Sequence, residues 1–293
     1  MKKIALIGAN GQLGSDIVKV FSSDSYFKTV PLTQNEIDIT DIEKTKKVLE
    51  NINPDLVVNT AAYHRVDEIE DNPQKAFLVN VIAEKNLAEI CEKNGWSLAF
   101  FSTDYVFGLD KNRKIPYVET DAPGPVSTYG VSKLAGEFVT RFTTTDHYVV
   151  RLCGLFGVTG AIGKGGNFVE TMIKLGKEKG EVRVVNDQIL TPTYTKNIAE
   201  NLLKLFKTEN YGLYHMTAEG ACSWWEFASE IFRLLKMNIK CIPVTSDQFK
   251  TRAKRPTYSV LENHNLKQLG LNRMVDWKKG LELYLKEKGH ISG

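Results

Sequence analysis

Short apolar runs alternate with amphipathic segments through the first 152 residues, and no other feature of the sequence restricts the fold as strongly. Residues 55–59, for example, read DLVVN, an unbroken apolar run of the kind that is buried on both faces of a parallel sheet. Signals for antiparallel hairpins do not occur between these runs. We therefore predict an α/β fold with a Rossmann-like, doubly wound parallel sheet, in which ligands bind at the carboxyl ends of the strands.

The elements of this sheet are expected in a regular order along the chain. Strands are predicted at residues 3–7, 29–32, 55–59, 97–102 and 147–152, and helices at residues 12–21, 42–51, 73–93 and 129–141. Thr40 and Glu43 have the spacing of a capping box ahead of the second helix. The motifs that carry chemistry follow the carboxyl ends of these strands.

The pattern changes after residue 152. Residues 154–166 contain six glycines, which predicts a mobile loop, and further helices are expected at 167–177, 224–235 and 277–286. Ser223 and Glu226 have capping-box spacing before the helix at 224–235. We interpret residues 1–153, with 187–216 returning to them, as a dinucleotide-binding domain, and residues 154–186 and 217–293 as a smaller substrate-binding lobe.

Length and composition limit the functional classes. A chain of 293 residues suits a cofactor domain plus a smaller lobe, and a net charge of +3 gives no indication of nucleic-acid binding. No apolar stretch has the length of a membrane span, and polar residues interrupt the first apolar run too early for a signal peptide. The four cysteines are scattered, and the five histidines lack metal-ligand spacing. We expect a cytoplasmic protein with reduced thiols, no metal site and no nucleic-acid or membrane partner, and we leave a homodimer open.

Three glycines follow the first predicted strand. Gly8, Gly11 and Gly14 form a GxxGxxG pattern, in which glycines allow a tight turn and a close approach of the backbone to a pyrophosphate. The amides and the positive dipole end of the helix that follows would favour phosphate groups. Between a strand and a helix, this pattern predicts a dinucleotide site.

The choice between NADH and NADPH stays open. The end of the second predicted strand, residues 30–34, has neither an acid for a ribose 2′-hydroxyl nor an arginine for a 2′-phosphate. The missing acid favours NADPH slightly. Further on, Asp38 and Ile39 would meet the adenine, or Asp38 would simply belong to a turn before a helix.

Tyr129 and Lys133 are four residues apart on a predicted helix, so both lie on one face, within reach of one shared ligand. A free phenol has a pKa of about 10, and a neighbouring ammonium favours the phenolate, so that Tyr129 can exchange a proton near neutral pH. A solvated surface tyrosine is the alternative. The preceding strand end, residues 101–107 (FSTDYVF), supplies a hydroxyl where a substrate carbonyl would need a second hydrogen-bond donor.

Together these residues resemble the extended short-chain dehydrogenases/reductases. STDYVF at 102–107 and YGVSKLAGE at 129–137 are similar to runs of the dTDP-4-dehydrorhamnose reductase family in particular. Further similar runs cover nearly the whole chain: NTAAY at 59–63, GNFV at 166–169, VNDQ at 185–188, TPT at 191–193, GLYH at 212–215 and RP at 255–256. The resemblance implies NAD(P)H-dependent reduction of the C4 keto group of a nucleotide-activated 6-deoxysugar, foremost dTDP-4-dehydro-L-rhamnose to dTDP-L-rhamnose for polysaccharide synthesis.

The resemblance also implies a role for each matching residue. Tyr129 would donate a proton to the C4 oxygen, Thr103 would polarise that carbonyl, and Lys133 would hold the nicotinamide ribose. The residues implied at the cofactor, besides Lys133, are Gly8, Gly11, Gln12, Leu13, Gly14, Asp38, Ile39, Ala61, Ala62 and Tyr63. Those implied at the sugar nucleotide are Asp104, Tyr105, Asn167, Gln188 and Arg255.

For Arg255 the chemistry of the side chain agrees independently. A guanidinium binds a diphosphate through paired hydrogen bonds, which suits a nucleotide sugar. The basic run at 250–255 that contains it is also typical of a solvated loop, and this alternative stays open.

Two departures from the family pattern fall on the substrate side. Family members often have a tryptophan after the strand ending near residue 151, where this chain has Gly154, and the segment 157–167 is longer and richer in glycine. These differences leave open another nucleotide-bound 4-keto sugar or the opposite stereochemistry. A non-catalytic, dinucleotide-binding regulatory subunit is a further alternative, which the intact Thr103, Tyr129 and Lys133 disfavour.

Overall fold

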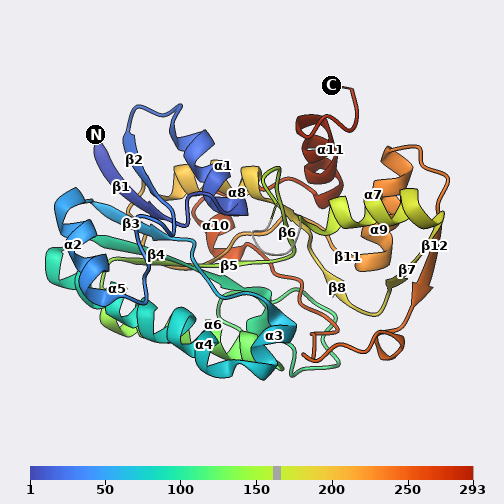
Figure 1. Ribbon diagram of the computed structural model, residues 1–293, viewed down its shortest axis with the longest axis horizontal. Coiled ribbons are helices and arrows are strands. Elements are labelled where there is room, and N and C mark those ends of the chain that lie inside the picture. Colours follow the sequence, from blue (N-terminus) through green and yellow to red (C-terminus); the bar gives the residue numbers. More distant parts are fainter. Residues whose placement is uncertain (161–165, 293) are drawn as a thin grey trace.

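A six-stranded parallel sheet forms the centre of the computed structural model, which describes residues 1–160 and 166–292 (Figure 1). The strand order is β10-β5-β4-β3-β1-β2, and each neighbouring pair is parallel. The strands are β1 (Lys2–Ile7), β2 (Phe27–Leu32), β3 (Leu56–Asn59), β4 (Ser97–Thr103), β5 (His147–Leu152) and β10 (Gly212–His215). Because β2 and β3 lie on opposite sides of β1, the winding of the chain reverses there. The predicted doubly wound α/β fold is confirmed.

Strand β1 is apolar throughout because both of its faces are covered. Ile4 and Leu6 belong to the core on one face of the sheet, and Ala5 and Ile7 to the core on the other. All four side chains are at most 2% exposed. The alternation of the two faces along one strand explains why the sequence shows no polar residue at every second position.

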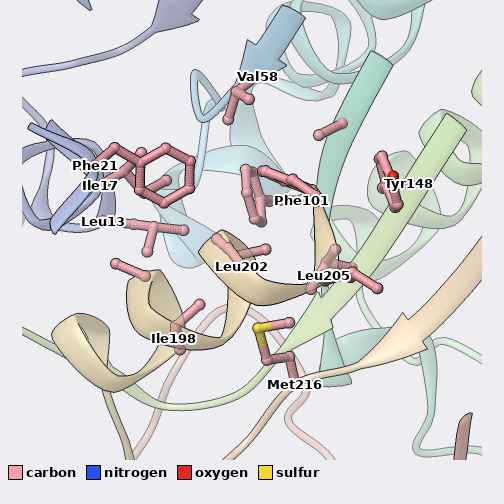
Figure 2. Packing of buried hydrophobic residues seen from close by; sticks show 14 of the residues in the cluster. Leu13, Ile17, Phe21, Val58, Phe101, Tyr148, Ile198, Leu202, Leu205 and Met216 are labelled. Carbon is pink, nitrogen blue, oxygen red and sulfur yellow. The ribbon is translucent and has the colours of Figure 1, made fainter. Parts of the chain in front are cut away.

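Helices α1 (Gln12–Phe21) and α8 (Thr195–Leu205) cover the first face together, although they are far apart in sequence. Figure 2 shows Phe21 of α1 and Leu202 of α8 pointing toward Phe101 of β4. The domain that the first half of the chain begins is therefore completed by α8 and β10 from the second half.

The opposite face is covered by α2 (Ile42–Ile52), α5 (Ala83–Asn94) and α6 (Thr128–Thr143). The single helix predicted at 73–93 is interrupted: α4 (Pro73–Phe77) continues into a π-helical turn (Leu78–Ile82) and then into α5. This wider turn contains Asn80, whose amide exchanges two hydrogen bonds with the backbone of Tyr63 and donates a third to Ser132 on α6. The insertion thus joins the loop after β3 to α6, and backbone periodicity in the sequence cannot reveal it.

One predicted capping box is correct and the other is wrong. Ser223 and Glu226 exchange both hydrogen bonds at the start of α9 (Trp224–Leu234). At α2, however, the cap is Asp41, whose carboxylate accepts a hydrogen bond from the backbone of Lys44. Thr40 instead bonds to Asp38, because the helix starts one residue later than a Thr40 cap requires.

Elements that follow β5 along the chain, apart from α8, β10 and α10, form the second lobe, seen at the right of Figure 1. Its core includes Phe156, Phe227 and Tyr284, and α9 packs there with α7 (Phe168–Lys179) and α11 (Trp277–Glu287). Three short strand pairs complete it: β7 (Glu181–Val185) with β12 (Lys240–Val244), β8 (Ile189–Leu190) with β11 (Cys222–Ser223), and β6 (Leu155–Phe156) with β9 (Thr193–Tyr194). The remaining short helices are α3 (Val66–Asp71), α10 (His264–Gln268) and two 3-10 turns, Asp104–Val106 and Ser246–Gln248.

The structure differs from one prediction about the second half of the chain. Strand β6 lies within the segment 154–166 that was predicted to be a mobile loop throughout, while residues 161–165 of that segment lie outside the described residues. The division into a dinucleotide-binding domain and a substrate-binding lobe stays an interpretation. Across the described ranges, no helix combines the length and apolar character that a membrane span needs.

Candidate active site

A cleft of about 680 Å³ opens where the winding of the sheet reverses. It is lined by the carboxyl ends of β1, β3, β4 and β5, and by residues of α7, β8 and α9 from the second lobe. In doubly wound sheets this crevice is where ligands bind. The cleft therefore contains the candidate active site.

The first turn of the cleft can only be built from glycines. Gly8 has a φ of 79°, and a Cβ at this position would lie 2.5 Å from the hydroxyl oxygen of Thr60. A Cβ on Gly14 would lie 2.2 Å from the carbonyl oxygen of Gly8. The strand and α1 approach each other so closely that no side chain fits between them, as the GxxGxxG pattern predicts.

The N-terminus of α1 is open toward the cleft. Its capping residue, Gly11, offers no side-chain hydrogen bond to the first amides of the helix, and Gln12 and Leu13 line the cleft beside it. The amide oxygen of Gln12 is buried and has no hydrogen-bond partner within the described part of the chain. Free backbone amides at a helix N-terminus fit the pyrophosphate of a dinucleotide, whereas the unpaired oxygen of Gln12 can accept a hydrogen bond from a donor such as a ligand hydroxyl.

The other residues predicted at the cofactor line the same cleft. These are Asp38, Ile39, Ala61, Ala62 and Tyr63. The carboxylate of Asp38 accepts hydrogen bonds from the backbone and hydroxyl of Thr40, which lower its pKa. Asp38 therefore has a structural partner in the turn before α2 while it also faces the cleft. Gln34 lines the cleft just after β2, in the stretch 30–34 that contains neither an acid nor an arginine.

Thr103, Tyr129 and Lys133 are brought together in this cleft. Thr103 ends β4, and the other two lie one turn apart on α6. Helix α6 can approach the end of β4 because residue 130 is glycine: a Cβ there would lie 2.2 Å from the carbonyl oxygen of Tyr105. The hydroxyls of Thr103 and Tyr129 and the ammonium of Lys133 therefore line the same cleft.

The environment of Tyr129 differs from the sequence-based expectation. Burial raises its pKa above the ordinary value, the charge of Asp104 raises it further, and a hydrogen bond with Thr103 opposes both. Lys133 was expected to lower this pKa, but its ammonium lies 3.9 Å from the ring centroid of Phe100 instead. Tyr129 is accordingly held as a neutral phenol, which is a proton donor.

Lys133 is only 2% exposed and has acidic neighbours. Burial lowers its pKa, and the nearby carboxylates of Glu84 and Glu137 oppose this shift. Burial in turn raises the pKa of Glu84, which accepts hydrogen bonds from Asn59 and Thr140. Among the residues that the structure describes, the ammonium makes no hydrogen bond, so its donors remain available to a ligand in the cleft.

A buried polar network that the sequence did not reveal lies behind Lys133. Arg151 of β5 forms a bidentate ion pair with Glu137 of α6, and its guanidinium also contacts His215 of β10. Ser102, next to Thr103, donates a hydrogen bond to Glu137. The spacing of residues 129, 133 and 137 on one helix face was a signal for Glu137, but its partner on β5 could not be inferred from it.

Of the five residues predicted at the sugar nucleotide, some line the cleft and others do not. Asp104 and Tyr105 line the cleft, but Asp104 is 3% exposed and accepts hydrogen bonds from Thr103 and Ser259. Burial raises the pKa of Asp104. Asn167 lines the cleft too, while its side chain caps α7 and donates to Gly157. Asp104 and Asn167 therefore have structural partners that already use much of their hydrogen-bonding capacity.

Gln188 and Arg255 do not line this cleft. The amide of Gln188 donates to Ser246 at 2.8 Å. Arg255 donates to Asp67 of α3 at 2.8 Å, and its charge opposes the rise in the pKa of the half-buried Tyr105. Tyr105 in turn contacts the ring of Tyr129, so Arg255 lies near the predicted catalytic residues, on a rim that joins α3 to the segment before residue 256.

The cleft also contains residues that were not predicted to bind a ligand. Trp224 lines the cleft, whereas its neighbour Trp225 donates to the carbonyl of Cys241 outside it. Cys153 lines the cleft with a buried thiol whose pKa burial raises, in agreement with an inert cysteine. Other such residues are Asn10, Arg65, Lys75, Phe168 and Leu190. Within the described ranges, no cluster of three or more metal-ligating side chains occurs.

Comparisons with known proteins agree with this geometry. A family model described as RmlD substrate binding domain matches residues 1–289. The spore coat polysaccharide biosynthesis protein SpsK of Bacillus subtilis is 37% identical over 98% of this chain and 98% of its own. The dTDP-4-dehydrorhamnose reductase of Burkholderia thailandensis is 33% identical over 97% of this chain and 98% of its own. The dTDP-4-keto-6-deoxy-D-glucose reductase of Streptomyces niveus is also 33% identical, over 94% and 93%.

One solved structure extends the similarity to three dimensions. The dTDP-4-dehydrorhamnose reductase of Bacillus anthracis in complex with NADP matches with a TM-score of 0.91 and 36% sequence identity. The match covers 98% of this chain and 99% of the other. Both lobes of the fold are included in it.

Proposed function

This chain belongs to the RmlD substrate-binding domain family, and from that premise we propose that it reduces the C4 keto group of a nucleotide-activated 6-deoxysugar with NADPH or NADH. The observation that carries the proposal is the meeting of Thr103, Tyr129 and Lys133 in the cleft that starts at the glycine turn. A binding module without chemistry has no need for a buried proton donor at this place.

The protein residues supply a proton and orient the carbonyl. When bound, the nicotinamide supplies the hydride. Tyr129, held neutral by burial and by Asp104, donates its proton to the C4 oxygen as negative charge develops there. Thr103, whose hydroxyl donates to Asp104 in the structure, turns to donate a hydrogen bond to the same oxygen when the substrate binds. The free donors of the Lys133 ammonium hold the nicotinamide ribose.

The substrate proposed first is dTDP-4-dehydro-L-rhamnose, which would yield dTDP-L-rhamnose. The names of the Burkholderia and Bacillus anthracis relatives support this choice. The complex of the latter with NADP, and the lack of an acid at residues 30–34, favour NADPH over NADH. Arg255 and Tyr105 are proposed at the diphosphate and its sugar, with Arg255 exchanging its ion pair with Asp67 for the ligand.

A second candidate substrate keeps the chemistry and changes the sugar. Gly154 has a φ of 53°, and a Cβ there would lie 3.1 Å from Pro192, so this wall of the cleft has only backbone. The Streptomyces niveus relative is named for dTDP-4-keto-6-deoxy-D-glucose, which differs from the first substrate in stereochemistry. A cytoplasmic location and a homodimer remain predictions.

The test is oxidation of NADPH and NADH, followed by absorbance, with freshly prepared dTDP-4-dehydro-L-rhamnose and dTDP-4-keto-6-deoxy-D-glucose. We expect turnover with the first sugar, with dTDP-L-rhamnose as the product. Faster turnover with the second would transfer the assignment to that sugar. Tight cofactor binding without turnover of either would favour the regulatory-subunit alternative.

A further inference from the structure

Two aromatic side chains of the second lobe face the cleft that contains Tyr129. Trp224 is the first residue of α9, and Phe168 is the first residue of α7; both are partly exposed and both line the cleft. Their ring centroids lie 4.6 Å apart at an interplanar angle of 41°. Together they make an apolar surface in a space whose other side chains include the catalytic hydroxyls.

The position of Trp224 is fixed by the elements around it. Ser223 caps α9 with the reciprocal bonds of a capping box, and its hydroxyl also donates to Asn186 at 2.7 Å. Phe227 packs against both Phe168 and Trp224 from one turn further along α9. An aromatic side chain that is held in this way loses little conformational freedom when a ligand packs on it.

The surface lies on the sugar side of the catalytic group. Strand β11, which ends at Ser223, pairs with β8, whose Leu190 also lines the cleft. Leu190 lies over Gly154, where a Cβ would be 3.1 Å from its Cδ1 atom. Cys153, next to Gly154, hydrogen-bonds to the carboxylate of Asp104 beside Thr103. A short series of residues in contact therefore leads from Thr103 to Trp224.

The diphosphate and the cofactor are expected elsewhere. Arg255 lies outside the lining of this cleft and contacts α3, and the glycine turn at Gly8 begins the cofactor end. The part of the substrate that remains for Trp224 to contact is therefore an uncharged group of the sugar near C4. A 6-deoxyhexose offers such a group, because its C6 methyl and ring C–H groups form an apolar face that can pack on an aromatic ring.

We propose that Trp224, supported by Phe168, is the wall on which the apolar face of the deoxysugar packs, and that it determines specificity for the sugar. This inference rests on the proposed function. It predicts that Trp224 contributes to binding of the sugar, with no contribution to binding of NADPH or of the nucleotide without its sugar. Trp225 is the matched control, because it starts the same helix but bonds to Cys241 outside the cleft.

The experiment compares Trp224→Leu and Trp225→Leu with the unmodified protein. Dissociation constants are measured by calorimetry for NADPH, for dTDP and for dTDP-L-rhamnose, and KM and kcat for the keto sugar. For Trp224→Leu we expect about a 10-fold weaker affinity for dTDP-L-rhamnose and a KM raised by a similar factor. Affinities for NADPH and dTDP should stay within about 2-fold of the unmodified protein, as should every value for Trp225→Leu.

Other outcomes overturn the proposal separately. An unchanged affinity of Trp224→Leu for dTDP-L-rhamnose would show that Trp224 does not bind the sugar. An equal loss of affinity for dTDP would show that the ring packs on the nucleotide base instead. If Trp224→Leu unfolds, Trp224→Phe provides the same comparison with a smaller loss. Absence of turnover by the unmodified protein would count against the proposed function alone, since the binding measurements need no chemistry.

Discussion

Arg151 and Glu137 form a bidentate ion pair, with Nε 2.8 Å from Oε1 and Nη2 2.7 Å from Oε2, and both side chains are at most 2% exposed. Glu137 lies one helical turn beyond Lys133 on α6, and Arg151 lies on β5. The pair therefore joins the helix that carries the proposed proton donor to β5, the neighbour of the edge strand β10.

Glu137→Gln should destabilise the fold strongly. The substitution keeps the shape of the side chain but leaves a buried guanidinium without its carboxylate, and breaking such a pair costs about 3–5 kcal/mol. Urea unfolding measures the loss. Glu282→Gln, on the surface of α11 with Lys279 and Lys286 as partners, serves as the control and should have a much smaller effect. Similar losses for the two variants would contradict the importance of the buried pair.

Tyr129→Phe should abolish turnover while the affinity for NADPH stays nearly unchanged, because only the hydroxyl that donates the proton is removed. A decrease in kcat of at least about 100-fold is expected for loss of a general acid. Steady-state kinetics and a cofactor titration check both halves of the prediction. Tyr26→Phe, an exposed tyrosine outside the cleft, is the control. Substantial turnover by Tyr129→Phe would exclude Tyr129 as the acid.

Gly130→Ala should impair the site through the backbone. The new methyl group would lie 2.2 Å from the carbonyl oxygen of Tyr105, so α6 must move away from the end of β4. We expect a loss of stability of about 2 kcal/mol or more and a lower kcat, because Thr103 and Tyr129 separate. Gly270→Ala, where the site is open but φ is 66°, should cost only about 1 kcal/mol and leave kcat unchanged. Wild-type kinetics for Gly130→Ala would show that this close approach is dispensable.

Acid should unfold the protein partly through His215. Burial, and then the charge of Arg151, lower its pKa from 6.5 to about 3 in the folded state. Since the unfolded chain binds this proton more readily, stability is fully present above pH 6.5 and is lost as the pH falls from 6.5 toward 3. The contribution has a limiting slope of about 1.4 kcal/mol per pH unit.

The same measurement in His215→Gln isolates this contribution. The variant is less stable at neutral pH, but its free energy of unfolding should decrease less steeply between pH 6 and pH 4 than that of the unmodified protein. Denaturant unfolding at several pH values provides the comparison. Parallel slopes for the two proteins would mean that other groups account for the acid sensitivity.

The sequence predicted the features that depend on neighbours along the chain. The glycine turn at Gly8, the pairing of Tyr129 with Lys133 on one helix face, and the strand β5 at His147–Leu152 all follow from local patterns, and the structure contains each of them. The capping box at Ser223 is of the same kind. Local sequence determines backbone turns and helix faces because the relevant contacts are within a few residues.

Features that depend on distant contacts were missed. Trp224 faces the cleft only because β11 pairs with β8, and a tryptophan at a helix start gives no sign of which side it will occupy. The ammonium of Lys133 lies against Phe100 of β4, and the expected interaction with the phenol of Tyr129 is not made. The periodicity of a helix does not show which strand residues its side chains will contact. The side chain of Gln188 donates to Ser246, which is 58 residues away along the chain, and no local pattern in the sequence predicts this contact.

The place of β10 in the sheet also has a consequence for synthesis of the chain on the ribosome. Its neighbour β5 ends at Leu152, but β10 begins only at Gly212, after much of the second lobe has been made. Until then the edge of β5 has unpaired backbone groups, and Arg151 lacks the contact with His215. The five strands that emerge first therefore form an incomplete sheet with an unpaired edge, and such an edge can pair with another chain.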